Sequence, residues 1–191
     1  MRIIAGVAKG RNLAPVAGVT RPTSDRAREA LFSTLLSEFG DFENLKFLDL
    51  YAGSAAVGLE ALSRGASIVH AVENDEGALK TIRNNHEIVQ SSKPSGAFKL
   101  YSMSANKFLN NCEDSYDIIF MDPPYDVTDK VVQDLVELIS KKKIIKSGGV
   151  LVIERATKRE RNSSPFQWPS PFKELRTKEY GVATLYYGEM G

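Results

Sequence analysis

Residues 49–58 read DLYAGSAAVG, and their place between an apolar run and a helical pattern predicts the class of fold. Residues 47–50 are apolar enough for a short buried strand, whereas residues 55–64 read as a helix ended by Gly65. Gly53 lets the backbone pass close to a ligand, and Gly58 lets the helix pack closely on the strand. A glycine-containing turn in this context is typical of α/β proteins that bind nucleotides.

Strand and helix patterns alternate on both sides of this turn. We expect strands at residues 47–50, 67–72, 98–103, 117–121 and 149–154, and helices at 55–64, 76–89, 106–111 and 128–142. Strands separated by helices imply right-handed crossovers and a doubly wound, mostly parallel sheet. Residues 172–180 and 182–187, separated by Gly181, predict a C-terminal antiparallel hairpin, which completes a seven-stranded sheet. In the last helix we expect the inward residues to be Val131, Val132, Leu135, Leu138 and Ile139.

The N-terminal residues predict a small appendage. Residues 1–22 fit a β-hairpin and a loop, and residues 23–39 fit a helix that Thr23, Ser24 or Asp25 can cap. Its apolar face comprises Ala27, Ala30, Leu31, Leu35 and Phe39, and we expect Arg26 and Arg28 to lie off that face. We therefore expect two units, residues 1–40 and residues 41–191.

Composition excludes several classes of protein. The chain has 191 residues, of which 42% are hydrophobic and 26% charged, as in soluble domains. Its one cysteine, Cys112, provides neither an internal disulfide nor a metal cluster. No apolar run suits a signal peptide or a membrane span, so we expect a cytoplasmic protein with no metal and no membrane partner.

Charge is distributed unevenly along the chain. Residues 1–30 carry six Lys/Arg against two Asp/Glu, a net charge of +4. Residues 31–140 carry eight against seventeen, a net charge of −9, and residues 141–191 carry eleven against five, a net charge of +6. Basic ends around an acidic middle indicate a polyanion partner such as nucleic acid, although scattered solvated lysines give the same count.

Residues 120–125 read FMDPPY and follow a β-rich apolar run. The two prolines end the strand, because neither can donate to a sheet ladder. Asp122, two carbonyl groups and the ring of Tyr125 are then held at the carboxyl end of a strand, where ligands bind in open α/β sheets. Such an acceptor-rich pocket suits a planar group with an exocyclic amine. The alternative is a Pro-Pro turn with Tyr125 packed on the core.

Glu73 stands 20 residues after Gly53, at the end of the next strand. There a carboxylate accepts hydrogen bonds from both hydroxyls of a ribose, which indicates an adenosine cofactor; the alternative is a tight turn and a surface glutamate. Asp49 favours the cationic S-adenosylmethionine over a dinucleotide, whose pyrophosphate needs the helix N-terminus.

The two motifs DLYAGSAAVGLEAL and FMDPPY resemble those of class I S-adenosylmethionine-dependent methyltransferases that act on exocyclic amines. The N-terminal segments MRIIAG, KGR and RPTSDRAREALFS resemble the bacterial 16S ribosomal RNA guanine-N2 methyltransferases, the RsmD family, and the resemblance covers nearly the whole chain. Four positions depart from that family's pattern. Tyr51 replaces Phe, Ala55 replaces Gly, and Ser104 stands where Asp or Asn is usual near the adenine. Tyr125 stands where many relatives have Phe.

The resemblance implies a Rossmann-like fold, S-adenosylmethionine as cofactor, and methyl transfer to the N2 amine of a guanine in 16S ribosomal RNA. The RNA is either free or part of a small ribosomal subunit, and we expect a monomer. The expected catalytic residues are Asp122, Pro123, Pro124 and Tyr125. The expected cofactor-binding residues are Asp49, Tyr51, Gly53, Ala55, Glu73, Asn74, Ser104 and Ala105. The expected RNA-binding residues are Arg2, Lys9, Arg11, Arg21, Thr23, Arg26 and Arg28.

Several other functions stay open from the residues. The same chemistry on a DNA adenine normally needs a larger base-recognition domain than this chain can hold. A glutamine methyltransferase favours Asn at position 122. A catalytically silent RNA-binding assembly factor is a different class, and Gly53, Glu73 and Asp122 argue against it. A dehydrogenase has no clear use for the FMDPPY motif.

Overall fold

A computed structural model describes residues 1–17, 25–124, 126–157 and 166–191. These described residues form seven strands: β1 (Lys46–Leu50), β2 (Ile68–Glu73), β3 (Ala97–Ser102), β4 (Tyr116–Met121), β5 (Ile145–Ala156), β6 (Phe172–Tyr180) and β7 (Ala183–Met190). They form one sheet in the order β3-β2-β1-β4-β5-β7-β6. The first five are parallel, and β7 pairs antiparallel with both β5 and β6. The expected mostly parallel, seven-stranded sheet with an antiparallel C-terminal hairpin is therefore confirmed.

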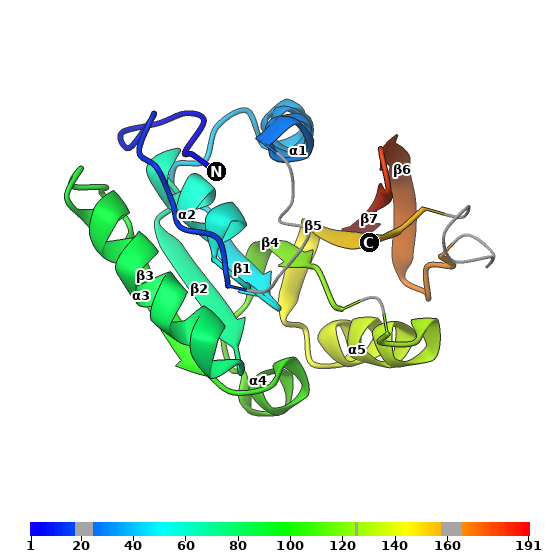
Figure 1. The fold of residues 1–191 in the computed structure, drawn as a ribbon. Coiled ribbons are helices and arrows are strands. Elements are labelled where there is room, and N and C mark those ends of the chain that lie inside the picture. Colours follow the sequence, from blue (N-terminus) through cyan, green and yellow to red (C-terminus); the bar gives the residue numbers. More distant parts are fainter. Residues whose placement is uncertain (18–24, 125, 158–165) are drawn as a thin grey trace.

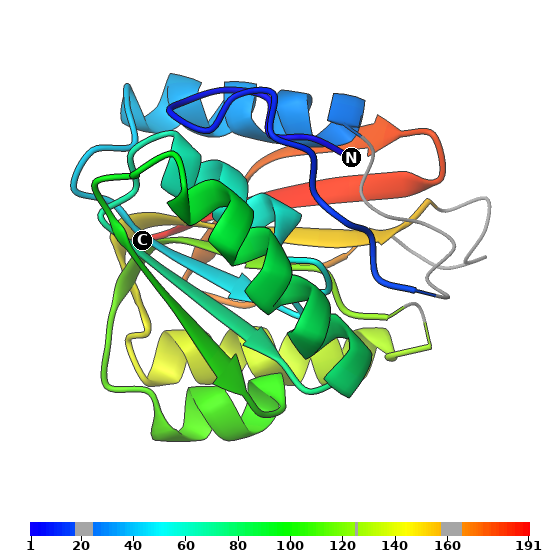
Figure 2. The same ribbon diagram turned by 60° about the vertical axis from the view of Figure 1, so that its left-hand side comes forward.

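The described residues form five helices. These helices cover the two faces of the sheet (Figures 1 and 2). They are α1 (Asp25–Phe39), α2 (Ala56–Ser63), α3 (Glu76–Gln90), α4 (Ala105–Asn111) and α5 (Asp129–Lys141). Neighbouring strand residues point to opposite faces. Phe47 on β1 accordingly packs in a cluster with residues of α1, α2 and α3, whereas Leu48 packs with residues of α4 and α5. Within the described residues, no helix combines the length and the apolar character that crossing a bilayer requires.

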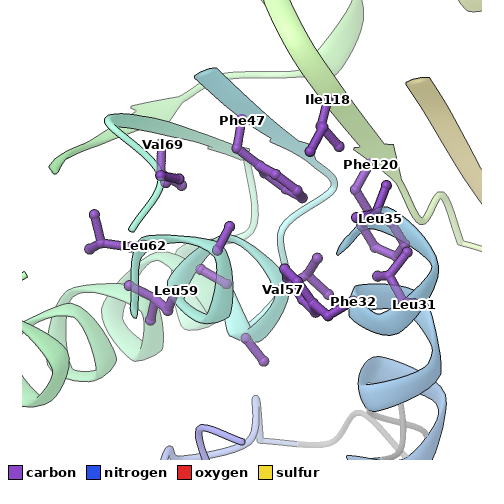
Figure 3. Close-up of a cluster of buried hydrophobic side chains, with 14 of the residues drawn as sticks. Leu31, Phe32, Leu35, Phe47, Val57, Leu59, Leu62, Val69, Ile118 and Phe120 are labelled. Atoms are coloured by element: carbon purple, nitrogen blue, oxygen red, sulfur yellow. The ribbon is translucent and has the colours of Figure 1, made fainter. Parts of the chain in front are cut away.

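The cluster beneath α1 and α2 joins the N-terminal segment to the main sheet (Figure 3). Leu31, Phe32 and Leu35 of α1 are fully buried beside Phe120 of β4. Ile3, Ala8 and Leu13 of the preceding segment belong to the same cluster. Residues 1–13 fold back as a hairpin, with an antiparallel bridge between Arg2 and Asn12. Residues 1–40 and 41–191 thus share one hydrophobic core. Their division into an RNA-contacting part and a catalytic part is a division by function, and it stays a prediction.

Helix α5 is rotated slightly from the expected orientation. Val131 is 45% exposed, whereas Val132, Leu135 and Ile139 are buried as expected. Val136, which is absent from the expected inward set, is fully buried. The prediction for Val131 is wrong because adjacent apolar residues at the start of a helix fit either phase of a 3.6-residue repeat, and packing against the sheet selects one.

Candidate active site

The loop after β1 has an unusual backbone. Tyr51, Gly53 and Ala55 all have left-handed conformations, with φ values of 60°, 54° and 55°. Such conformations are costly for residues with a Cβ atom. A Cβ atom added to Gly53 would have no heavy atom within 4 Å, so this glycine faces open space. Ala55 is fully buried, and its N–H donates to the Ala52 carbonyl at 2.6 Å. The loop therefore presents backbone rather than side chains at Gly53.

Glu73, at the end of β2, is held by backbone N–H groups of two loops. Its Oε2 atom accepts a hydrogen bond from Gly53 N at 2.9 Å. Its Oε1 atom accepts from Asn74 N at 2.7 Å and from Asp75 N at 3.0 Å. A carboxylate can accept about four hydrogen bonds, two on each oxygen. These three bonds therefore leave one acceptor site on Oε2. The carboxylate is preorganised beside the backbone of Gly53.

A pocket lies at the carboxyl ends of β1, β2 and β3. It brings together five of the residues expected to bind a cofactor: Tyr51, Glu73, Asn74, Ser104 and Ala105. Ser104 also caps α4, because its hydroxyl accepts a hydrogen bond from Lys107 N at 3.3 Å. The sequence prediction missed three further residues of the pocket wall: Val72, Met103 and Asn106. Each of the three is next to a predicted site residue or to the end of a strand, and this adjacency could have predicted that they line the pocket.

Asp49 lies beneath the loop and is 1% exposed. Its Oδ2 atom accepts a hydrogen bond from Gly58 N, in the first turn of α2, at 2.9 Å. A Cβ atom on Gly58 would lie 3.0 Å from that oxygen, so the glycine permits the contact. The pKa of Asp49 is raised to about 8, mainly because the carboxyl group is buried. The hydrogen bond from Gly58 lowers this pKa, and the nearby charge of Glu73 raises it. An N–H group in the N-terminal turn of α2 is thus bound by the carboxyl group of Asp49.

Asp122 follows β4 directly, and β4 runs beside β1 in the sheet. The Asp122 N–H donates to the carbonyl of Leu50, the last residue of β1, at 3.3 Å. The pKa of Asp122 is raised well above its ordinary value, first by burial and then by the nearby carboxyl groups of Glu154 and Asp49, while Arg155 opposes the shift. The candidate amine-binding residue and the candidate cofactor loop therefore meet at one edge of the sheet.

The prolines after Asp122 begin a turn toward α5. Pro123 is buried and Pro124 is exposed. The Val127 N–H donates to the Pro124 carbonyl at 3.0 Å, which closes the turn. Tyr125 lies outside the described residues, so its expected stacking role stays a prediction.

Two buried polar side chains tie the N-terminal segment to the site. Asn85 on α3 accepts from Ala14 N at 2.8 Å and donates to the carbonyls of Ala14 at 2.9 Å and Ser54 at 3.0 Å. Glu60 on α2, which is fully buried, accepts from Ile4 N at 2.7 Å and from Ala5 N at 2.9 Å. The sequence prediction missed both residues, since a lone Asn or Glu in a helix pattern gives no signal of burial.

The residues expected to bind RNA divide into two groups. Arg2, Lys9, Arg11 and Arg26 are exposed. Arg28 is fully buried: it donates to the Arg2 carbonyl and to Asp25, and its Nε lies 3.9 Å from Glu60. The expectation that Arg28 lies off the buried face of its helix is wrong, because pairing with acidic groups and a backbone carbonyl compensates for its burial. Arg21 and Thr23 lie outside the described residues.

Comparison with known proteins gives consistent matches over nearly the whole chain. Residues 1–189 match the model of the family described as "Conserved hypothetical protein 95". The chain is 34% identical over 155 residues to "Putative rRNA methyltransferase YlbH" of Bacillus subtilis, covering 81% of this chain and 82% of the relative. It is 29% identical over 188 residues to "Ribosomal RNA small subunit methyltransferase D" of Haemophilus influenzae, covering 96% and 91%. The solved structure of "Putative methyltransferase yhhF from Escherichia coli" has a TM-score of 0.81 and 28% identity, covering 100% of this chain and 98% of that chain.

Proposed function

This chain belongs to the family described as "Conserved hypothetical protein 95", and from that premise we propose that it methylates the exocyclic N2 amine of a guanine in small-subunit ribosomal RNA. Two relatives are named as ribosomal RNA methyltransferases, and one of these names specifies the small subunit. The observation that carries the proposal is the hydrogen bond from Asp122 N to the Leu50 carbonyl, which fixes the acceptor-rich motif beside the loop after β1.

The residues of the pocket fit S-adenosylmethionine better than a dinucleotide. Asp49 already occupies the N-terminal turn of α2, where a pyrophosphate needs free N–H groups. Gly53 leaves open space beside the loop, and Glu73 has an acceptor site for a ribose hydroxyl. Contact with both ribose hydroxyls requires one of the three N–H bonds to Glu73 to open. Tyr51, Ser104 and Ala105 would contact the adenosine, and the bound cofactor supplies an electrophilic methyl group.

Asp122 acts on the substrate amine. The lone pair of a guanine 2-amino group is delocalised into the ring, which makes the nitrogen a poor nucleophile. Asp122, when ionised, accepts one amine hydrogen and the Pro123 carbonyl accepts the other. These hydrogen bonds draw the nitrogen toward tetrahedral geometry and stabilise the positive charge that develops on it. The rigid Pro-Pro turn holds both acceptors in place, so positioning contributes as well.

RNA reaches this edge of the sheet through the basic N-terminal segment. Arg2, Lys9 and Arg11 lie on the N-terminal segment, which Glu60 holds at Ile4 and Asn85 holds at Ala14. Phosphate contacts from these side chains orient the RNA without selecting its sequence. The target guanine must leave its stack to reach Asp122, and we assign Tyr125 to stack on the displaced base. A protein that acts on ribosomal RNA with no membrane partner is expected in the cytoplasm.

The decisive experiment supplies labelled S-adenosylmethionine together with either undermodified 16S ribosomal RNA or small subunits. Nucleoside analysis is expected to give N2-methylguanosine. N6-methyladenosine, or transfer to DNA but not to RNA, would contradict the proposal. Comparison of free RNA with subunits identifies which of the two is the substrate.

A further inference from the structure

Arg155, near the end of β5, is buried in the same region as Asp122. Strands β4 and β5 run parallel with Met121 paired to Ile153, so Glu154 and Arg155, still within β5, lie at the level where Asp122 and Pro123 follow β4. Arg155 itself pairs with Thr184 of β7 and is 2% exposed. A fully buried arginine is uncommon and needs compensating partners.

The guanidinium of Arg155 contacts both ends of the turn that follows Asp122. Its Nη1 donates to the Pro124 carbonyl at 3.4 Å, and its Nη2 donates to the Val127 carbonyl at 2.5 Å. Nη2 also donates to Asp129 Oδ1, on the first residue of α5, at 3.2 Å. One side chain from a central strand therefore connects residue 124, residue 127 and the start of α5, on both sides of position 125.

Arg155 is also the cation next to a group of buried carboxyl groups. Asp49 is 1% exposed and Glu154 is 6% exposed, and both raise the pKa of Asp122, whereas Arg155 lowers it. Arg155 likewise lowers the pKa of Tyr51, against the effects of burial and Glu73. Burying several carboxyl groups together without a cation would favour their neutral forms.

We propose that Arg155 is a positioning residue for methyl transfer: its guanidinium holds the turn after Asp122 on the sheet and places a positive charge at the strand edge where Asp122 lies. This inference rests on the proposed function, because it assumes that Asp122 acts as an ionised acceptor for the substrate amine. It assigns no substrate contact to Arg155, whose two Nη atoms already contact the turn and the start of α5. The two contributions separate on substitution, since lysine keeps the charge without the planar fork and methionine keeps neither.

The test compares Arg155→Met and Arg155→Lys with the matched control Arg176→Met, which removes a half-exposed arginine of β6 paired with Glu38. For Arg155→Met we expect a roughly tenfold or greater loss of kcat from displacement of the turn. We also expect the acid limb of the pH profile of kcat/KM to shift to higher pH by about one pH unit or more. For Arg155→Lys we expect a reduced kcat with the acid limb close to that of the wild type. The control should match the wild type in both respects.

A measurement without catalysis separates this inference from the proposed function. The Asp122 carboxyl is titrated by ¹³C NMR in wild type, Arg155→Met and Arg155→Lys, with Asp122→Asn to assign the signal. A higher titration midpoint in Arg155→Met supports the inference even if the wild type methylates no RNA, an outcome that would remove only the proposed function. An unchanged midpoint overturns the inference whether or not the enzyme is active. If Arg155→Met does not fold, Arg155→Lys provides the test. A shifted titration midpoint of Asp122 or an unchanged kcat in Arg155→Lys would overturn the inference.

Discussion

The carboxylate of Glu73 accepts a hydrogen bond from Gly53 N at 2.9 Å, which links the end of β2 to the loop after β1. We therefore expect Glu73→Gln to weaken binding of S-adenosylhomocysteine by about tenfold or more, because the amide loses one acceptor and the charge that strengthens its hydrogen bonds. Isothermal calorimetry measures this affinity. Glu76→Gln, at an exposed position of α3, is the control and should bind as the wild type does. Equal affinities of the two variants would remove Glu73 from the cofactor site.

Substitutions at Gly53 and Gly58 should both lower stability, but only the substitution at Gly53 should obstruct the cofactor. Gly53→Ala places a methyl group in open space at a φ of 54°, so it should cost only about 1–2 kcal/mol of stability but obstruct the cofactor. Gly58→Ala places its methyl group 3.0 Å from Asp49 Oδ2 and 3.1 Å from Val69 Cγ1, so it should cost about 1–3 kcal/mol through overpacking. Urea unfolding and calorimetry together distinguish the two. A Gly53→Ala protein with unchanged cofactor affinity would contradict the proposed pocket.

Asp122→Ala should lower kcat by about 10²–10³-fold while cofactor affinity stays nearly constant. Because the ionised carboxylate is the active form and its pKa is raised, activity should fall with decreasing pH at a higher pH than an ordinary aspartate would give. The pH profile of kcat/KM measures this limb. Asp126→Ala, at an exposed position four residues later, is the control. An active Asp122→Ala enzyme would show that another group orients the amine.

Asp49 should make the stability of the protein depend on pH. Its pKa rises from 3.8 to about 8 on folding, so the folded state holds a proton that the unfolded state releases. Its contribution to stability is complete below about pH 4 and is lost as the pH rises toward 8. Asp49→Asn can still accept the Gly58 hydrogen bond and should gain stability over the wild type as the pH increases. Urea unfolding at pH 5, 7 and 8 measures the difference; a constant difference would show that Asp49 is not protonated in the folded protein.

The exposed basic residues of the N-terminal segment and the buried Arg28 should respond differently to substitution. Replacing Arg2, Lys9 and Arg11 together by Ala should weaken RNA binding with little change in stability. The slope of the logarithm of the RNA-binding constant against the logarithm of the salt concentration should become less steep by about 0.7–0.9 for each phosphate that the variant no longer neutralises. Arg28→Met should instead lower stability by on the order of 3 kcal/mol, because it leaves the fully buried Glu60 without its Arg28 partner and breaks the ion pair with the half-exposed Asp25. Filter binding at several salt concentrations and urea unfolding measure the two effects. Full RNA affinity in the triple variant would move the RNA surface elsewhere.

The cofactor loop and the acceptor motif could be predicted because their signals are local. Gly53 and Glu73 are 20 residues apart, and one strand-helix-strand repeat brings them together. The family model and the named relatives confirm the type of enzyme. The doubly wound, mostly parallel sheet followed from the same repeat, together with the handedness of its crossovers.

Arg28 and Arg155 were not predictable in the same way. The partners of Arg155 lie 26 to 31 residues away, and those of Glu60 in the N-terminal segment lie 55 and 56 residues away. A sequence window shows that such residues are charged, but it does not show which backbone N–H or carbonyl groups of a distant segment will form hydrogen bonds with them. Val131 and Val136 illustrate the same limit for apolar residues, since only packing fixed the phase of α5.

The sequence by itself determined the alternation of strands and helices, the edge of the sheet that carries the site and the residue types available there, because these depend on local propensity and hydrophobic period. The tertiary structure alone decided which polar groups are buried and what they hold. Asn85 fastens the N-terminal segment to the cofactor loop, and Arg155 fastens the turn after Asp122 to the sheet. Burial of a polar group is favourable only when distant partners arrive in the right geometry, and that geometry exists only after the chain has folded.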